Sequence, residues 1–376
     1  MILKNAMVMD EDFRLRRLDI RILEDKIAEL GENLLGDSIT DMTGKYILPG
    51  FIDTHIHGAA GVSAKKTEPD LNPMTRFEAT QGVTALAITT GSSDLASTKK
   101  QLERIKTLSK TCKGSKIIAI HAEGPFINPE RKGAIKADNI LLPDIQTLDA
   151  LLDASGGLIK IITLAPEMKG ATEFIRYAVS KGITVSLGHT NATYEETKTA
   201  IEAGATQITH TFNAMRAINH RNPGILGAAF EDERIVCEMI CDYVHLHPAI
   251  IRMIYQIKGA DKINIVSDSG DSTGLNISEY ELEGVKRYIK DGVVRLADGT
   301  IAGSAMTVKD GVRNLLSAGF PIEDVSKMAS YNPAKSLHAE DSVGSIAIGK
   351  YADFVILNQD YDVEATFING VCVYKR

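Results

Sequence analysis

The 376-residue chain has few cysteines, no apolar run of membrane length and no cluster of basic residues. Its four cysteines, Cys112, Cys237, Cys241 and Cys372, form neither a disulfide framework nor a compact chelating pattern. We therefore expect reduced, mostly buried thiols in a cytoplasmic protein. No run approaches the ~20 apolar residues of a membrane span, and the first residues lack the apolar core of a signal peptide.

The charge balance excludes another class of partner. The formal net charge is -7, and nothing basic is clustered, so neither a nucleic acid nor an anionic membrane is expected to bind. A glycine-rich phosphate fingerprint is also missing after the early strands. What remains is an ordinary globular composition, with 44% hydrophobic and 24% charged residues, and enough chain for one large core or two modest ones.

The middle of the chain alternates apolar runs, typical of buried strands, with amphipathic runs, typical of helices. Strands are expected at Phe51–His57, Val83–Thr90, Lys116–His121, Leu158–Leu164, Ile183–Leu187, Ala205–Thr209, Ile235–Cys241 and Lys262–Val266. Helices are expected between them at Leu95–Lys110, Asp144–Leu152, Thr172–Lys181, Thr193–Ala203 and Pro248–Lys258. Eight such units predict an α/β fold, a (β/α)8 TIM-type barrel. A doubly wound open sheet is the alternative, disfavoured by the missing phosphate fingerprint.

Both ends of the chain have a different texture, with short alternating segments separated by turn residues. These segments are Ile2–Val8, Leu18–Leu23, Lys26–Leu30, Ala352–Leu357, Ala365–Ile368 and Val371–Tyr374. Neither end is long enough for a core of its own, and the first 50 residues suggest a small antiparallel unit. We predict one small β-sandwich domain from residues 1–50 and 342–376, with residues 51–341 forming the barrel.

His55 and His57 follow Pro-Gly and a short apolar strand. Alternate side chains of a strand share a face, so both imidazoles point the same way. Two imidazoles at the end of a buried strand form half of a divalent-metal site. The alternative is a pair of solvated or hydrogen-bonded core histidines, and the pattern favours the metal.

Other predicted strands end in residues of the same chemistry: Glu123, His189, His210 and Asp268. The carboxyl ends of barrel strands share one rim, where barrel enzymes carry their chemistry. Four imidazoles and two carboxylates therefore converge, a donor set that suits Zn, Fe(II), Mn, Co or Ni. His121, two residues before Glu123, is assigned a structural or supporting role.

A hydrolytic reaction accounts for the second carboxylate. A metal lowers the pKa of its bound water towards ~7, so Asp268 can accept that proton and return it to a leaving amine. Asp271 is the nearby rival, but its position in a loop is less constrained.

The chain resembles a known family at these residues. Pro49–Gly58 resembles the first barrel strand of the metal-dependent amidohydrolase superfamily, and Gly344–Asp353 resembles its return into the small β-domain. More narrowly, four segments are similar to N-acetylglucosamine-6-phosphate deacetylases: His121–Asn128, Gly188–Ala192, Thr209–Met215 and Gly303–Thr307. The resemblance covers essentially the whole chain, and the Glu-Gly-Pro and His-x-x-Asn-Ala-Met motifs are fairly specific.

The resemblance implies roles for individual residues. Glu123, His189 and His210 would hold the main metal, and His55 and His57 a second, with Zn or Fe favoured over Mn, Co or Ni. Asp268 matches the general acid/base. Substrate contacts are implied for Asn213, Ala214, Arg221, His245 and the site-closing loop Ile301, Ala302 and Gly303. Arg221 would reach the phosphate in the neighbouring subunit of a homodimer. A Gly/Pro-flanked guanidinium suits phosphate, and a solvated loop arginine is the less favoured alternative.

Four departures from the family pattern put the substrate in question. Ile135 stands where a histidine usually helps hold the acyl group, and an isoleucine side chain donates no hydrogen bond. Ser269 replaces an alanine, Tyr243 replaces a glycine, and residues 61–64 lack an aspartate often found there. We hypothesise that a second metal at His55 and His57 supplies the polarisation lost at position 135.

The expected function is a metal-dependent deacetylase that converts N-acetylglucosamine 6-phosphate to glucosamine 6-phosphate and acetate, in amino sugar catabolism. A deacetylase of a related N-acyl amino sugar, such as N-acetylgalactosamine 6-phosphate, is the first alternative. A diverged sugar-phosphate binder without turnover is the second. Dihydroorotases and isoaspartyl dipeptidases fit less well, because they bridge two metals with a modified lysine after the fourth strand, where this chain has Leu164–Glu167.

Overall fold

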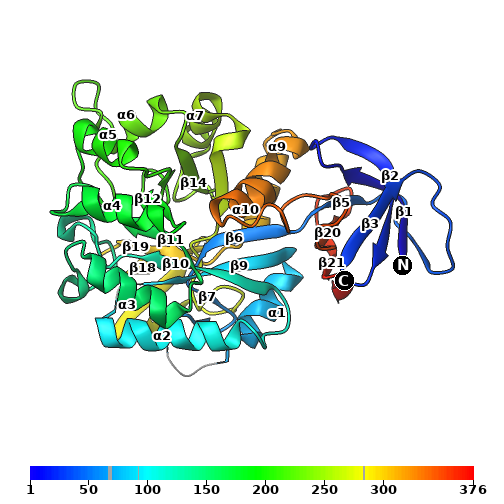
Figure 1. The fold of residues 1–376 in the computed structure, drawn as a ribbon, viewed down its shortest axis with the longest axis horizontal. Coiled ribbons are helices and arrows are strands. Elements are labelled where there is room, and N and C mark those ends of the chain that lie inside the picture. Colours follow the sequence, from blue (N-terminus) through cyan, green and yellow to red (C-terminus); the bar gives the residue numbers. More distant parts are fainter. Residues whose placement is uncertain (67–69, 92, 283) are drawn as a thin grey trace.

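A parallel eight-stranded barrel forms the body of the molecule in the computed structural model, which describes residues 1–66, 70–91, 93–282 and 284–376 (Figure 1). Its strands follow one another around the barrel in chain order. They are β6 (Phe51–Ile56), β9 (Val83–Thr90), β10 (Lys116–Glu123), β11 (Ile159–Leu164), β12 (Thr184–Leu187), β13 (Gln207–Ile208), β14 (Val236–Ile240) and β15 (Ile263–Val266). The predicted barrel is confirmed, with strand bounds within a few residues of those expected.

The barrel closes where its last strand meets its first. The Asp268 N–H, just beyond β15, donates to the carbonyl oxygen of His55 at 2.8 Å, and Ile56 pairs with Ser269 in a parallel bridge. The strands are apolar and buried on both faces, as in β9, where all eight residues are buried. Such strands need cover on their outer side, which the helices provide.

The helices surround the barrel (Figure 1), and their buried apolar residues share core clusters with residues of the barrel strands. They are α1 (Asn72–Thr80), α2 (Leu95–Leu108), α3 (Ile145–Ser155), α4 (Ala171–Ser180), α5 (Tyr194–Glu202), α6 (Gly224–Glu231), α7 (Pro248–Lys258), α8 (Val308–Ser317), α9 (Ile322–Ser326) and α10 (Asn332–Ser336), with a short π-helix at Lys327–Tyr331. Their starts follow from local chemistry: Thr193 and Glu196 form a capping box at the start of α5. No helix among the described residues is long and apolar enough to cross a membrane.

Strands from both chain ends pair with each other beside the barrel, and Figure 1 shows both termini in this unit. The hydrogen-bonded order is β22-β21-β20-β5-β1-β2-β3, with β4 also on β1. Their bounds are β1 (Ile2–Met9), β2 (Leu15–Leu23), β3 (Lys26–Gly31), β4 (Ile39–Asp41), β5 (Tyr46–Pro49), β20 (Phe354–Leu357), β21 (Val363–Ile368) and β22 (Val371–Lys375). They enclose a core of their own that includes Leu3, Ile47 and Phe354. The predicted β-sandwich from both ends is confirmed.

One detail of this unit differs from the expectation. The three segments expected in the first 50 residues pair antiparallel, as β1 with β2 and β2 with β3, but the unexpected strands β4 and β5 run parallel to β1. The chain between β3 and β4 crosses the sheet, so β4 and β5 run in the direction of β1. The proposed domain limits at residues 50 and 342 stay a prediction.

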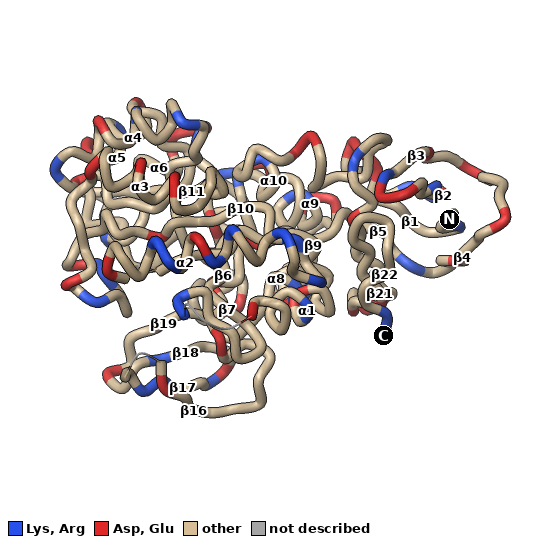
Figure 2. The backbone as a smooth tube through the Cα atoms, turned by 60° about the horizontal axis from the view of Figure 1, so that its bottom comes forward, with Lys and Arg blue, Asp and Glu red and all other residues tan. Residues whose placement is uncertain are grey.

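An antiparallel sheet after β15 was not predicted. It consists of β16 (Glu279–Leu282), β17 (Val285–Lys290), β18 (Val293–Leu296) and β19 (Ile301–Ser304). Figure 2 shows this sheet projecting from the barrel next to β7 (Gly58–Ala59), which pairs with β8 (Val62–Ser63). Ile301, Ala302 and Gly303, predicted as a loop, lie in β19. Ser304 bridges to Ser269, which anchors the sheet to the barrel rim.

Candidate metal centre and substrate cavity

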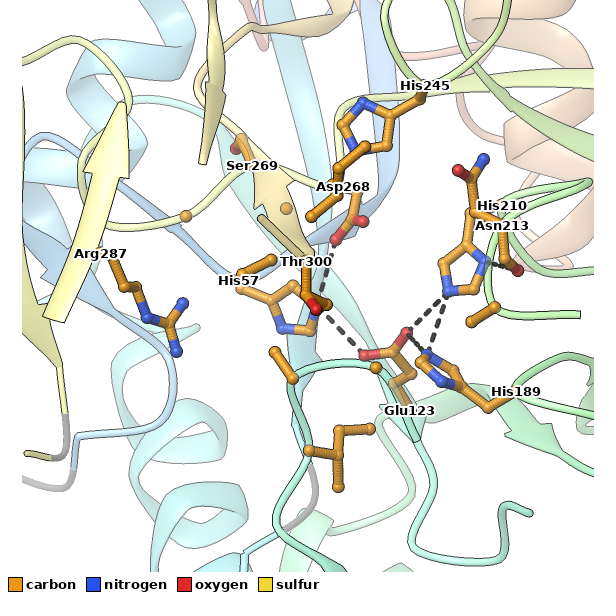
Figure 3. A pocket seen from close by; sticks show the side chains of 18 of the residues that line it. His57, Glu123, His189, His210, Asn213, His245, Asp268, Ser269, Arg287 and Thr300 are labelled. Atoms are coloured by element: carbon orange, nitrogen blue, oxygen red, sulfur yellow. Dashed lines mark hydrogen bonds and ion pairs between the residues drawn. The ribbon is translucent and has the colours of Figure 1, made fainter. Parts of the chain in front are cut away.

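Three predicted metal ligands meet at the carboxyl ends of their strands. Glu123 ends β10, His189 follows β12, and His210 follows β13. The Oε1 atom of Glu123 lies 3.1 Å from Nε2 of His189 and 3.2 Å from Nε2 of His210, and the two Nε2 atoms are 3.2 Å apart (Figure 3). These three atoms converge on one point, within reach of a single ion.

The outer nitrogens of both rings fix the tautomer of each neutral ring. Nδ1 of His189 contacts the carbonyl oxygen of Arg131 at 2.8 Å, and Nδ1 of His210 contacts that of Asn213 at 3.1 Å. A carbonyl oxygen only accepts, so each Nδ1 carries the proton and donates it. In the neutral rings both Nε2 atoms therefore present lone pairs to each other and to the Glu123 carboxylate. Such lone pairs repel unless a cation lies among them, so the donor set fits a divalent metal.

His55 and His57 approach the same carboxylate from β6. Nε2 of His57 lies 3.2 Å from Oε2 of Glu123 and 3.4 Å from Oδ1 of Asp268. Nε2 of His55 lies 3.5 Å from Oε1 of Glu123 and 3.6 Å from Oδ1 of Asp268. Glu123 therefore lies between the two histidine pairs, and Asp268 completes a second group of metal-ligand type with His55 and His57.

His55 carries an unmet hydrogen-bonding group. Its side chain is fully buried, and its Nε2 makes no hydrogen bond to any described residue. A buried polar atom without a partner costs about 1–3 kcal/mol. An ion between His55, His57 and Asp268 would satisfy it, so this second position also fits a metal.

Glu238 in β14 is a supporting residue that the sequence analysis missed. Its carboxylate lies 3.0 Å from Nδ1 of His55 and accepts hydrogen bonds from the Gln207 side chain and the His210 backbone N–H. Carboxylates behind metal-ligating histidines hold the ring orientation and its tautomer. The available signal was a lone acidic residue inside the apolar run Ile235–Cys241.

His121 lies behind the site, as predicted. Its Nδ1 faces the carbonyl oxygen of Thr54 at 3.0 Å and its Nε2 faces Oγ1 of Thr163 at 2.8 Å, so neither nitrogen is left for a metal. Burial lowers the pKa of His121 to about 4, which keeps this ring neutral at physiological pH.

The carboxyl groups of the centre are held as anions. Burial raises the pKa of Glu123, but His55, His189 and His210 facing it outweigh burial and lower that pKa well below its usual range. Burial likewise raises the pKa of Asp268, and the hydrogen bond with His57 together with the charge of His55 lowers it further than burial raises it. Both are therefore available as ligands or proton acceptors.

Several rim residues have a left-handed backbone, which non-glycine residues rarely adopt. The φ angles are 49° at His189, 29° at His210, 48° at Asp268 and 51° at Ala214. Each such residue costs about 1 kcal/mol or more, and such strain concentrates at functional sites. Tyr243 has φ 65°, a backbone conformation that glycine adopts without strain, and its hydroxyl donates to the carbonyl oxygen of Asn314 at 2.6 Å.

The centre opens into a cavity of about 410 Å³, the size of a small-molecule site (Figure 3). Of the predicted substrate contacts, those that line it are Asn213, Ala214, His245, Ile301, Ala302 and Gly303. His57, Glu123, His189, His210 and Asp268 line it as well, whereas His55 lies behind them. Ile135 forms part of the wall and is 7% exposed.

His245 is set up to contact a ligand. Its Nδ1 lies 2.6 Å from Oδ2 of Asp242, whose other oxygen accepts the His245 and Val244 N–H groups. Nε2 of His245 is buried without a described partner. By contrast, Asp271 lines the cavity but forms no ion pair with a histidine among the described residues. Asp268, which pairs with His57, is therefore the better candidate for the proton acceptor.

Arg221 is the predicted site residue that this chain does not bring to the cavity. It is exposed in the loop after Met215, and it is absent from the described cavity wall. Three other cationic side chains that were not predicted, Lys65, Arg131 and Arg287, line the wall instead.

A parallel barrel with histidine and carboxylate donors at its carboxyl rim defines a metal-dependent hydrolase. The amidohydrolase family model matches residues 46–373. An N-acetylglucosamine-6-phosphate deacetylase of Vibrio furnissii is 36% identical over 87% of this chain and 83% of its own length. An N-acetylgalactosamine-6-phosphate deacetylase of Escherichia coli O157:H7 is 32% identical over 98% of both chains.

Solved structures agree with these relatives. A point mutant of the Mycobacterium smegmatis N-acetyl-D-glucosamine-6-phosphate deacetylase, in complex with N-acetyl-D-glucosamine-6-phosphate, is 31% identical. It matches 100% of this chain and 99% of that chain with a TM-score of 0.93. The chain belongs to the amidohydrolase family and, within it, to the N-acetylglucosamine-6-phosphate deacetylases.

Proposed function

We propose that this chain is a metal-dependent deacetylase that hydrolyses N-acetylglucosamine 6-phosphate to glucosamine 6-phosphate and acetate. The observation that carries the proposal is the convergence of Glu123, His189 and His210 on one point, with the Asp268 carboxylate across the same cavity. The relatives of similar length act on N-acetyl amino sugar phosphates, as their names state.

Glu123, His189 and His210 would hold the main ion, and His55 and His57 with Asp268 a second. Nitrogen and oxygen donors without thiolate suit Zn or Fe(II) best, with Mn, Co and Ni as further candidates. When bound, a divalent ion at this rim lowers the pKa of a water ligand and polarises the amide carbonyl.

Asp268 handles the proton in this proposal. Its carboxylate accepts the proton of the attacking water and passes it to the amide nitrogen as the carbon–nitrogen bond breaks. The water oxygen ends in acetate, and the amino sugar phosphate leaves as an amine. The hydrogen bond with His57 holds Oδ1 of Asp268 toward the centre.

Substrate contacts follow from the cavity wall. We propose that His245 donates or accepts through its free Nε2, that Asn213 and Ala214 meet the sugar, and that Ile301, Ala302 and Gly303 close over it. Arg221 is exposed on the surface, which suits the proposed role in a partner subunit of a homodimer. A cytoplasmic location remains part of the proposal.

Ile135 cannot donate a hydrogen bond to the acyl group, as the histidine of the family pattern would. We propose that an ion at the second position polarises the acyl group instead. The double variant His55→Ala/His57→Ala should therefore have both a lower turnover and a lower metal content. Unchanged turnover after loss of one ion would contradict this role.

The related activity on N-acetylgalactosamine 6-phosphate is the second candidate, because one full-length relative carries that name. The test is acetate release by the purified, metal-loaded chain from each of the two sugar phosphates. We expect a higher kcat/KM for the glucosamine epimer. A preference for the galactosamine epimer would select the second candidate, and binding without acetate from either would indicate a non-catalytic protein.

A further inference from the structure

The cavity wall opposite the histidine centre contains a buried cation that the proposed reaction does not use. Arg287 in β17 points into the cavity from the antiparallel sheet (Figure 3). Its neighbours Lys286 and Tyr288 are exposed on the other face of the strand, as the two-residue strand period requires. Arg287 itself is only 9% exposed, so the register of β17 aims this one cation inward.

The guanidinium of Arg287 lacks an anionic partner. Its Nε atom is buried without a hydrogen bond, and Arg287 forms no ion pair with any carboxylate in the described ranges, Asp271 of the same cavity included. Among the described residues it contacts Tyr280, whose ring centroid lies 6.0 Å from the guanidinium carbon and whose side chain forms a hydrogen bond with Arg287. Arg131, another cation of the wall, is by contrast tied to Oδ1 of Asn191 at 3.1 Å.

A desolvated cation is costly unless it is paired, and a ligand anion can supply the missing partner. The guanidinium offers planar, paired N–H donors that match the oxygens of a phosphate or a carboxylate. The aromatic face of Tyr280 restrains the side chain, so less freedom is lost on binding.

We propose that Arg287 binds an anionic group of the substrate and does so within the same chain. The inference rests on the proposed deacetylase function and deepens it, because it assigns substrate selection to the antiparallel sheet. The anionic group that Arg287 binds is either the phosphate of the amino sugar or a carboxylate carried by the acyl group.

The experiment compares Arg287→Gln with Lys286→Gln in the full-length, metal-loaded protein. Lys286 is the adjacent residue on the outer face of β17, where it pairs with Glu279, so both variants remove one positive charge from one strand. Initial rates are measured with N-acetylglucosamine 6-phosphate, N-acetylglucosamine and N-succinylglucosamine. Metal content and Tm are recorded for each variant, and Arg287→Lys tests whether charge alone restores binding.

For a phosphate partner, Arg287→Gln raises KM for N-acetylglucosamine 6-phosphate about ten- to hundredfold with kcat little changed. Activity on the uncharged sugar then stays the same. For a carboxylate partner, only kcat/KM for the succinyl substrate falls, by a similar factor. Lys286→Gln changes neither. Equal losses on charged and uncharged substrates, or no difference between the two variants, would overturn the proposal.

Failure of the proposed function can be recognised separately. If the wild-type chain releases no acyl group from any substrate, ligand binding is measured instead by the shift in Tm with glucosamine 6-phosphate and with succinate. A shift that Arg287→Gln loses and Lys286→Gln keeps supports the anion site without catalysis. The absence of a shift in the wild-type chain would overturn it.

Discussion

The barrel rim and the β16–β19 sheet face each other across one cavity, but they position their side chains differently. On the rim, His189 and His210 are fixed by backbone carbonyl oxygens and sit in strained backbone conformations. On the sheet, the alternation of side chains along β17 turns Arg287 toward the cavity, and its Nε has no hydrogen-bond partner.

This difference assigns the reaction to the rim and the choice of substrate to the sheet. Barrel closure, hydrogen bonds and burial all hold the rim side chains in place. Catalytic groups need such support, because their positions must be kept to within a fraction of an ångström. The sheet lies between β15 and α8 in the chain and contacts the rim through β19, so an inward side chain of β17 such as Arg287 can change without moving the rim. A relative could therefore keep the reaction and alter the substrate.

Removal of the shared carboxylate should have the largest effect on the rim. Glu123→Gln leaves a neutral amide facing four imidazoles and should lower kcat/KM by about a thousandfold or more, with loss of metal. Acetate release and elemental analysis measure both. Glu173→Gln, an exposed change on α4, is the control. Full metal content with near-normal activity would contradict the assignment of Glu123.

Asp268→Asn tests proton transfer apart from metal binding. An amide cannot accept the proton of the attacking water, so kcat should fall roughly 10²- to 10⁴-fold while KM and the main metal remain. Single-turnover rates with metal analysis provide the measurement. A kcat within tenfold of the wild-type value would contradict this role of Asp268 and favour Asp271 as the proton acceptor.

Glu238→Gln tests the supporting layer of the rim. The variant keeps the size of the side chain but removes the negative charge behind His55, so affinity for the second ion should fall about ten- to hundredfold. Metal titration of the stripped protein would show the weaker site while the site of Glu123, His189 and His210 persists. Two unchanged affinities would make Glu238 a purely structural residue.

Gly303→Ala tests how tightly the sheet is held against the rim. Gly303 has φ 105°, and an added Cβ would lie 3.1 Å from the carbonyl oxygen of Asp268. Displacement of that backbone should lower kcat/KM roughly tenfold. Gly299→Ala is the matched control, because Gly299 also has positive φ (86°) but its Cβ would meet no atom within 4 Å. Equal losses in both variants would indicate strain in the sheet alone.

Glu78 provides a change away from both walls. Burial raises its pKa well above the ordinary value of 4.5, and neither carboxyl oxygen has a hydrogen-bond partner in the described part of the chain. The folded chain therefore holds a proton that the unfolded chain releases, so this group's stabilising contribution is full below pH 4.5 and is lost as pH rises through the folded pKa. Glu78→Gln should be more stable than the wild type at alkaline pH and no more stable in acid, with activity unchanged. Unfolding curves across pH measure this, and parallel curves would contradict it.

The sequence predicted the rim far better than the sheet. Apolar strands ending in Glu123, His189, His210 and Asp268 are local patterns, and barrel topology alone brings their ends together. Glu238 was missed because its role depends on which residue β14 places behind His55. Arg287 was missed because a cation in a short polar strand looks solvent-exposed until its register is known.

Metal-dependent removal of an N-acetyl group is the reaction that we propose for the rim. Its most direct test is to strip the chain of metal and return Zn or Fe(II) stepwise with N-acetylglucosamine 6-phosphate present. We expect no acetate from the stripped chain, and acetate and glucosamine 6-phosphate in equal amounts as the ion is restored. Glu123→Gln should lack this activity. Equal acetate release with and without bound metal, or none with any metal tried, would contradict it.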